Sequence, residues 1–438
     1  MATSGATEGP GWPPSLWAAV TPAGPALPAL EGMVETEVAV IGAGFTGLST
    51  AIHLREAGIP CIVVEAAEPG WGASGRNNGQ VIPTLSRYDP AAIIRRHGAA
   101  GERFVAVLRD SAATLFDLAR HHGIAAEAEQ AGWVQPAHTP GRMRVVERRM
   151  RDWELHGAPV ALLDRAALRE MLGSDAWFGG FTNPTGGHVN PLALARGMAA
   201  TALTLGATIL ARSPVTGIAH QGGRWLVRSE RGTVRARALV LATNAYTGTF
   251  NRSLAPEIAT SVVPVLSWQM ATRPIGDNVA RSIIPGRQAM SDTHGELYFA
   301  RWDARGRLVT GGAVAIPANQ PARLRPMIGA RLQRLWPQIG EVRFDYVWSG
   351  NIGMTTDYFP HLHRLGPDGY AWAGCNGRAV ALSVALGREF ARAVQGVPEA
   401  ELGLPFTEPR PVPLHGLARR AASLMLMLYR WRDAREVA

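Results

Sequence analysis

Three glycines near the start of the chain have the spacing that suits dinucleotide binding. Gly42, Gly44 and Gly47 form a G-x-G-x-x-G pattern, and Glu65 follows 18 residues after the last glycine. In this pattern the first glycine permits a tight turn, the second lets the main chain approach a pyrophosphate, and the third lets helix and strand pack closely. A carboxylate at Glu65 can accept hydrogen bonds from both ribose hydroxyls. The pattern therefore predicts a dinucleotide site of the kind shared by NAD and FAD proteins.

The sequence around the glycines predicts the elements that must position them. Residues 38–41 are an apolar run typical of a strand buried on both faces, and "CIVVEA" has the character of a second buried strand. Between them, apolar residues recur at helical spacing up to Gly58, which is a common stop signal. The N-terminus of this helix would present free amides and the positive end of its dipole to the phosphates.

A second loop of small residues favours a flavin over a nicotinamide. Shortly after Glu65 comes "EPGWGASGRNNGQV", residues 68–81, which is dense in Gly, Ser and Asn. A flavin needs main chain against its pyrophosphate, its ribityl chain and its ring, whereas an NAD enzyme needs no second loop of this kind at this place. Ser74 can add a hydroxyl to the phosphates. An ordinary surface turn is the competing interpretation, because Gly and Asn are common turn formers.

Further segments resemble a known family. "ALVLATNAYTG" at 238–248 looks like a strand and turn of the D-amino acid oxidase superfamily of FAD enzymes, and residues 370–394 are similar to its closing strand, glycine turn and last core helix. Within this superfamily, "SLWAAVTPAGPALPALEG", "GFTGLSTAIHL" with "GASGRNNGQ", and "YVWSGNIGMTTDYFPHL" most resemble gamma-glutamylputrescine oxidoreductases. The resemblance covers nearly the whole chain.

The resemblance implies FAD as the cofactor. Cys375 does not match the place of the attachment cysteine of sarcosine oxidases, so we expect the FAD to be non-covalent. Val215 lies where this family lays main chain against the adenine side, and Arg378 lies in the last glycine turn. Pattern and resemblance together predict these cofactor-binding residues: Gly42, Gly44, Phe45, Thr46, Gly47, Glu65, Ala66, Gly72, Ala73, Ser74, Asn77, Asn78, Gly79, Val215, Thr243, Asn244, Gly374, Asn376, Gly377, Arg378 and Ala379.

The expected fold class is α/β, with a Rossmann-like FAD-binding domain of the glutathione-reductase type interleaved with a mixed β-sheet substrate domain. A length of 438 residues favours more than one domain. Asn190 as N-cap and Pro191 at the first helical position predict a helix that ends at Gly206. The expected divisions are an N-terminal arm at 1–34, the FAD-binding domain at 35–83, 188–250 and 346–405, the substrate domain at 84–187 and 251–345, and a C-terminal helical extension at 406–438.

The family resemblance implies oxidation of a C–N bond in a small amine or amino acid. A neutral amine would give a hydride to the flavin, and the resulting imine would hydrolyse to an aldehyde or keto product. No second G-x-G-x-x-G follows residue 60, which favours the organic substrate as the electron source. The chain contains no lysine, the residue that assists reaction with oxygen in sarcosine oxidases, so both O2 and an electron carrier stay open as acceptors.

Five residues are candidates for contact with the substrate, each with a core-packing alternative. His188 in "GGHVNP" can position or deprotonate the amine, although such a histidine is more often structural. Tyr298 and Arg301 in "ELYFARW" can bind a substrate carboxylate. Trp348 and Asn351 in "WSGNIG" resemble family residues that border the flavin ring, with Trp348 as a wall for an aliphatic amine.

Two rival functions stay open. Five arginines between 142 and 151 suit a phosphate-binding face, and a relative in the same superfamily modifies tRNA, although Arg148, Arg151, Glu147 and Glu154 are also typical of a solvated helix face. A flavin-binding protein without turnover is the other rival. The segment "LARRAASLMLMLYRWRD" fits either a weak membrane-surface contact or a helix that docks its Leu and Met side on the protein body.

Composition excludes several other classes. The charge of +9 comes from 44 basic and 35 acidic residues, and two cysteines are too few for a disulfide framework or a zinc cluster, so we predict no metal site. Residues 1–30 carry no basic side chain, and no apolar run approaches the ~20 residues of a spanning helix. We therefore expect a soluble, cytoplasmic chain.

Overall fold

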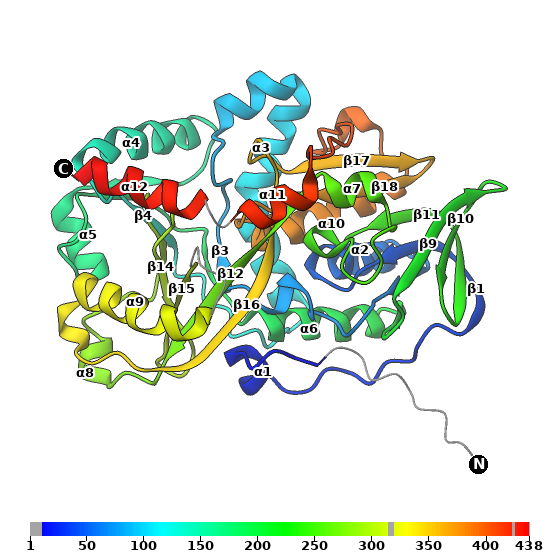
Figure 1. The fold of residues 1–438 in the computed structure, drawn as a ribbon. Helices are drawn as coiled ribbons and strands as arrows, with labels where there is room; N and C mark the ends of the chain where they lie inside the picture. The colour runs from blue at the N-terminus through cyan, green and yellow to red at the C-terminus, as the bar shows by residue number, and fades with distance from the viewer. Residues whose placement is uncertain (1–10, 314–318, 423–424, 438) are drawn as a thin grey trace, which may run out of the picture.

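Two eight-stranded sheets organise the chain and lie in opposite halves of the molecule (Figure 1). The structure is a computed structural model that describes residues 11–313, 319–422 and 425–437. The ends of the expected N-terminal arm (1–10) and C-terminal extension (438), and residues 423–424 within the latter, lie outside the described residues. The predicted α/β fold with two interleaved sheets is confirmed.

The first sheet is built around β1 (Gly32–Ile41) in the order β17-β18-β11-β1-β2-β8. β1 pairs in parallel with β11 (Gly232–Leu241) and with β2 (Cys61–Val64), so its apolar end is buried from both sides, as the sequence predicts. The remaining strands are β8 (Thr208–Leu210), β17 (His361–Gly366), β18 (Gly369–Ala373), and the hairpin β9 (Val215–Gln221) and β10 (Arg224–Ser229) attached to β11.

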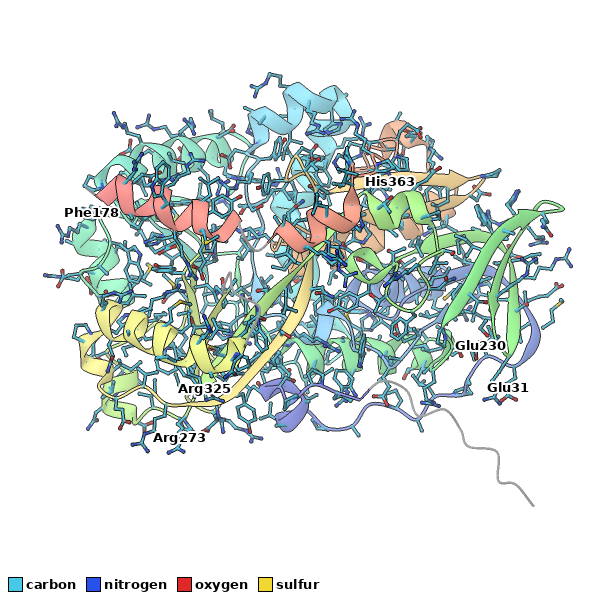
Figure 2. All side chains as sticks on the ribbon, viewed as in Figure 1. Glu31, Phe178, Glu230, Arg273, Arg325 and His363 are labelled. Atoms are coloured by element: carbon cyan, nitrogen blue, oxygen red, sulfur yellow. The ribbon has the colours of Figure 1, made fainter. Side chains whose placement is uncertain are left out.

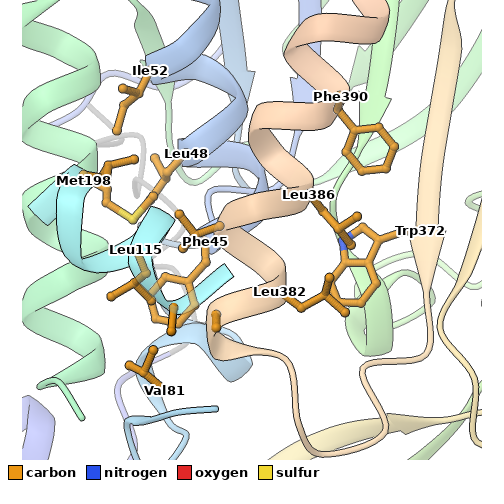
Figure 3. Packing of buried hydrophobic residues seen from close by; sticks show 14 of the residues in the cluster. Phe45, Leu48, Ile52, Val81, Leu115, Met198, Trp372, Leu382, Leu386 and Phe390 are labelled. Atoms are coloured by element: carbon orange, nitrogen blue, oxygen red, sulfur yellow. The ribbon is translucent and has the colours of Figure 1, made fainter. Parts of the chain in front are cut away.

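Four helices form the helical layer next to this sheet. They are α2 (Phe45–Glu56), α3 (Pro90–His121), α6 (Pro191–Thr204) and α10 (Val380–Val394). Helices α2 and α6 contact its strands, α10 packs on α2, and α3 packs on α10. Figure 3 shows Phe45, Leu48 and Ile52 of α2 packed with Leu382 and Leu386 of α10 in one hydrophobic cluster. The Asn190 side chain accepts from the Ala193 amide and Pro191 opens α6, which confirms the predicted helix start.

The second sheet has the order β16-β12-β15-β14-β13-β4-β6-β5 and carries the other side of the site. Its strands are β4 (Trp133–Pro136), β5 (Ala161–Leu163), β6 (Gly180–Asn183), β12 (Val263–Thr272), β13 (Ala289–Ser291), β14 (Phe299–Trp302), β15 (Leu308–Gly312) and β16 (Phe344–Met354). The short pair β3 (Gln80–Val81) and β7 (Gly187–His188) lies in a third, two-stranded sheet.

The remaining elements are helices around the two sheets. They are α1 (Leu16–Val20), α4 (Pro140–Leu155), α5 (Arg165–Leu172), α7 (Pro256–Thr260), α8 (Asp277–Ala280), α9 (Gln320–Leu335), α11 (His415–Ala421) and α12 (Met425–Val437). Charged side chains such as Glu31, Glu230 and Arg273 lie at the rim of the molecule in Figure 2. Within the described part of the chain, no helix combines the length and apolarity that crossing a membrane requires.

Two of the expected domain boundaries differ from the structure. β16 pairs with β12 over its whole length, so residues 346–354 belong to the second sheet and not to the FAD-binding unit. Helix α3, expected within the substrate domain, contributes Phe104 and Leu108 to the same hydrophobic cluster as α2 and α10. Both differences arise because pairing and packing partners far along the chain, not local sequence, decide the unit to which an element belongs.

The close contact at Gly47 yields the first prediction. A Cβ at this position would lie 1.9 Å from the Gly42 carbonyl oxygen, so Gly47→Ala must push α2 away from β1. We expect a loss of about 1–3 kcal/mol in the free energy of unfolding, as for other overpacked core sites. Gly217→Ala is the matched control, because the methyl group that it adds would have nothing within 4 Å. Equal denaturation midpoints for the two variants would contradict the prediction.

Candidate functional site

A cavity of about 800 Å³ runs between the two sheets. It starts at the carboxyl ends of the parallel strands, where Ile41, Val64 and Ala242 line it, and extends to Gln269 of β12 and Phe299 of β14. Ligands of open α/β sheets bind at this edge, and the volume is in the range of cofactor and substrate sites.

The dinucleotide end is formed by the glycine turn, Glu65 and Ser74. The amides of Ala43 and Ala67 donate to the Glu65 carboxylate over 2.7 and 2.9 Å, and the amide of Phe45 donates to Ser74 Oγ over 3.0 Å. Burial raises the pKa of Glu65, and the hydrogen bonds from the backbone amides oppose that shift. A Cβ on Gly44 would lie 2.8 Å from Ser74 Oγ, so only glycine leaves the two loops in contact.

Three side chains from separate elements hold the small-residue loop from behind. The indole N–H groups of Trp348 and Trp17 donate to the carbonyls of residues 76 and 77, both over 2.8 Å. The guanidinium Nε–H of Arg301 donates to the carbonyl of residue 78 over 2.7 Å. Three consecutive carbonyls of this loop are therefore turned away from the cavity.

The opposite wall is the turn between β18 and α10. Gly374, Asn376 and Gly377 all have positive φ, at 90°, 46° and 77°, which tightens the turn where α10 begins. The Asn244 side chain accepts from the Gly374 amide over 3.2 Å. Arg378 is buried beside Trp133 and donates to Ser291 Oγ over 3.3 Å. Burial lowers the pKa of Arg378 to about 9.

Most of the predicted cofactor residues meet in this cavity. Those that line it are Gly42, Gly44, Phe45, Thr46, Glu65, Ala66, Gly72, Ala73, Ser74, Asn77, Asn78, Val215, Thr243, Asn244, Asn376, Gly377, Arg378 and Ala379. Gly47, Gly79 and Gly374 lie behind the lining and shape the turns. Contact of these residues with FAD stays a prediction.

Polar atoms in the cavity wall fit a polar ligand. Arg76 Nη2, Gln80 Oε1 and Gln269 Oε1 are buried without a hydrogen-bond partner among the described residues, and all three side chains line the cavity. Buried polar groups are normally paired, so these atoms indicate where a ligand or water completes the wall. Together with the amides at the start of α2, they provide the donors and acceptors that FAD requires.

The structure corrects the predictions for His188 and Arg301. His188 is 1% exposed in β7, and its Nε2 hydrogen bonds to the Arg287 carbonyl over 3.0 Å, while burial lowers its pKa well below the usual value. The guanidinium of Arg301 donates to three main-chain carbonyls and stacks over Trp17. Neither side chain lines the cavity, so neither can reach a substrate there.

Of the other three candidates, Asn351 lines the cavity, whereas Trp348 and Tyr298 do not. Trp348 is 1% exposed and contacts Trp17, so the expectation of a substrate wall there is corrected. Tyr298 also lies outside the lining, between the His294 ring and the Arg331 guanidinium. The backbone amide of Asn351 donates to the Tyr246 hydroxyl over 3.0 Å, which fixes this stretch of β16.

Sequence reasoning missed the loop after β13. Asp292, His294 and Glu296 of "SDTHGEL" all line the cavity. Burial alone would raise the pKa of Glu296, but Arg430 and Arg331 outweigh it and lower that pKa. The sequence signal that could have revealed this loop is the pair Asp292 and His294, two positions apart and directly after a strand.

Helix α12 docks on this loop through polar groups, contrary to the expected Leu and Met side. Arg430 donates to Glu296 over 2.7 Å and Asp433 accepts from the Gly295 amide over 2.9 Å. Met427, Leu428 and Trp431 are instead 52%, 44% and 51% exposed. Figure 1 shows α12 in red beside α4, where Arg142 pairs with Glu436 over 2.6 Å.

Three of the five arginines of α4 lie next to acidic side chains. Arg149 pairs with Asp89 over 2.6 Å and Arg151 lies 3.9 Å from Glu147. Arg142, Arg148 and Arg149 line the cavity. Arg149 is 8% exposed, so the five arginines of 142–151 do not all lie on one exposed face.

Comparison with known proteins identifies the family of this chain. The family described as "DAO: FAD dependent oxidoreductase" matches residues 37–393. The chain belongs to the DAO family. The predicted family and its FAD cofactor are thereby confirmed.

Relatives match this DAO-family chain over most of its length. Gamma-glutamylputrescine oxidoreductase of Escherichia coli (strain K12) is 31% identical over 369 residues, covering 84% of this chain and 85% of the relative. The probable oxidoreductase OrdL of Haemophilus influenzae is 32% identical over 379 residues, again covering 84% and 85%. Glycine oxidase from Geobacillus kaustophilus matches the fold with a TM-score of 0.71 at 22% identity, over 86% of this chain and 99% of that chain.

The Glu65 carboxylate gives a prediction for FAD affinity. Glu65→Gln replaces a carboxylate oxygen with an amide group that cannot accept, so a ribose hydroxyl or a loop amide loses its partner. Hydrogen bonds to charged groups contribute about 1.5–3 kcal/mol, so we expect FAD to bind roughly 10- to 100-fold more weakly. Fluorescence titration of apoprotein with FAD measures the change. Glu68→Gln, an exposed carboxylate, is the control, and equal affinity of the two variants would exclude the ribose role.

Cys375 gives a prediction for the cofactor linkage. Burial raises the pKa of this thiol, and its sulfur accepts from the Gly353 amide over 3.3 Å. A protonated thiol is a poor nucleophile, so we expect no bond to the flavin. Precipitation of the holoprotein with trichloroacetic acid should leave all the FAD in the supernatant. A fluorescent protein band on a denaturing gel would contradict this.

Proposed function

We propose that this protein oxidises the C–N bond of a small amine or amino acid, with a gamma-glutamylputrescine-like amine as substrate. The observation that carries the proposal is the single cavity that joins the dinucleotide end at Glu65 to the polar end at Glu296. The E. coli gamma-glutamylputrescine oxidoreductase, at 31% identity, supports this substrate class.

The chain's residues have distinct tasks in this reaction. Glu65 and the amides at the start of α2 bind the ribose and pyrophosphate. Arg378 is buried at the β18–α10 turn, and its positive charge would stabilise the negative charge that a flavin ring gains when it is reduced. Bound FAD supplies the acceptor for the hydride that leaves the carbon next to nitrogen. Asn351, Gln269 and the loop after β13 then position the substrate carbon.

The cavity mouth favours a substrate that also carries an anionic group. Arg87 and Arg148 line the cavity, and neither forms an ion pair among the described residues. The side chains of Tyr358 and Tyr429 lie 5.2 and 5.6 Å from the Arg87 guanidinium, so their rings hold that cation near the opening. A carboxylate at the far end of the amine would find these two arginines, which agrees with a glutamyl-bearing substrate.

Anaerobic mixing of the yellow holoprotein with a panel of amines tests the function. We expect gamma-glutamylputrescine to bleach the flavin absorbance faster than putrescine, sarcosine or glycine, because those lack the distant carboxylate or the aliphatic chain. Admission of air then separates an oxidase, which turns yellow again, from a dehydrogenase, which stays bleached until a carrier is added. A holoprotein that no amine bleaches would be a flavin-binding protein without turnover.

A further inference from the structure

We propose that His294, oriented by Asp292, is the base that takes the proton from the substrate amine. The proposal rests on the proposed function and names a residue for the step that precedes hydride loss. Neither residue belongs to the glycine turns or to the segments that carry the family resemblance.

The Asp292 carboxylate is fixed in one orientation. It is 0% exposed and its Oδ1 accepts from the amides of His294 and Tyr298, both over 3.0 Å. Its Oδ2 accepts from His294 Nδ1 over 2.6 Å and from Trp177 Nε1 over 3.3 Å. With Nδ1–H donating to the carboxylate, the lone pair of the imidazole lies on Nε2.

Stacking fixes the plane of the His294 ring. The ring centroid lies 3.9 Å from that of His138 on one face and 3.9 Å from that of Tyr298 on the other, with interplanar angles of 22° and 15°. Arg331 lies 3.7 Å over the Tyr298 ring, so the stack ends on a cation. The side chain is 16% exposed, lines the cavity, and its Nε2 has no hydrogen-bond partner among the described residues. The free lone pair is therefore available to a ligand.

The loop that carries His294 lines the same cavity as the predicted cofactor-binding residues. It leaves β13 at Ser291, whose hydroxyl accepts from Arg378 Nη2 and, over 2.9 Å, from Trp133 Nε1. Gln80, behind the small-residue loop, donates to the Met290 carbonyl over 3.0 Å. His294 therefore follows a stretch of chain, residues 290–291, that is hydrogen-bonded to Gln80 on one side of the cavity and to Arg378 on the other.

The other carboxylates of the lining already have partners. Glu296 is paired with Arg430 and Arg331, and Asp89 is paired with Arg149. Among the described residues that line the cavity, His294 is the only histidine. The described part of the wall therefore offers one imidazole, with its Nε2 lone pair free, as a base.

The proton balance of the step is simple. An alkylammonium group has a pKa near 10.4, so the substrate arrives protonated at neutral pH. The N–H bond breaks, the proton moves to His294 Nε2, and the electron pair stays on the substrate nitrogen. That pair then assists loss of hydride from the adjacent carbon, and Asp292 stabilises the imidazolium that has formed.

Charged and titratable neighbours tune the step from several elements. Burial lowers the pKa of His138, and the charge of His294 acts in the same direction, so His138 stays neutral beside a protonated His294. The groups that surround the pair are His138, Arg142, Glu296, Tyr298, Arg331, Arg430, Asp433 and Glu436.

Stopped-flow reduction under anaerobic conditions tests the role in the holoenzyme. His294→Asn should slow flavin reduction about 10²- to 10⁴-fold at pH 7, the usual contribution of a general base. The deficit should shrink as pH rises and the amine loses its proton to solvent. His220→Asn is the control, because this histidine of β9 is exposed and does not line the cavity, and it should keep the wild-type pH profile.

A second measurement does not depend on turnover. In apoprotein with ¹⁵N-labelled histidine, the His294 resonances, identified by their loss in His294→Asn, should show a protonated Nδ1 and an unprotonated Nε2. Asp292→Asn should change that tautomer balance. An Nε2–H tautomer in the wild-type chain, or an unchanged pH profile in His294→Asn, would overturn the assignment. Failure of every amine to reduce the wild-type flavin would instead overturn the proposed function, and the base with it.

Discussion

The approach of α2 to the end of β1 is the constraint on which the site depends. It requires glycine at position 47, since any Cβ would collide with the Gly42 carbonyl. This contact brings the first amides of α2 to the edge of the sheet, where Glu65 and Ser74 accept hydrogen bonds from Ala43 and Phe45. The cradle is therefore organised by the chain's own side chains, and cofactor binding need not order it.

The second constraint is the orientation of the small-residue loop. Its consecutive carbonyls at 76–78 are held by Trp348, Trp17 and Arg301, which come from β16, α1 and β14. Arg301 lies 4.6 Å over the Trp17 ring and Trp17 packs edge-on against Trp348. Donors that bind carbonyls leave the opposite face of the loop to its amides and small side chains, which is the face a phosphate needs.

These contacts explain how far the sequence could predict the molecule. The glycine turn, the buried strands and the Asn190 cap are local patterns, and each appears where the sequence places it. The sequence also predicts functional roles for Arg301 and Trp348, but their partners lie 223 and 272 residues away, so it cannot reveal that they bind carbonyls and not substrate. For the same reason the pairing of Glu296 with α12 could not be predicted.

The charge balance around Asp292 and Glu296 determines which form of an amine the cavity stabilises. Glu296 faces two arginines, and Asp292 already accepts four hydrogen bonds from protein N–H groups. An ammonium ion therefore finds no unpaired carboxylate among the described lining residues. The α12 contacts preserve this state, because Arg430 neutralises Glu296 and Asp433 fixes the loop at Gly295. Because no carboxylate is free to stabilise an ammonium ion, the wall favours loss of the ammonium proton, and the neutral amine that results is the form that can release a hydride.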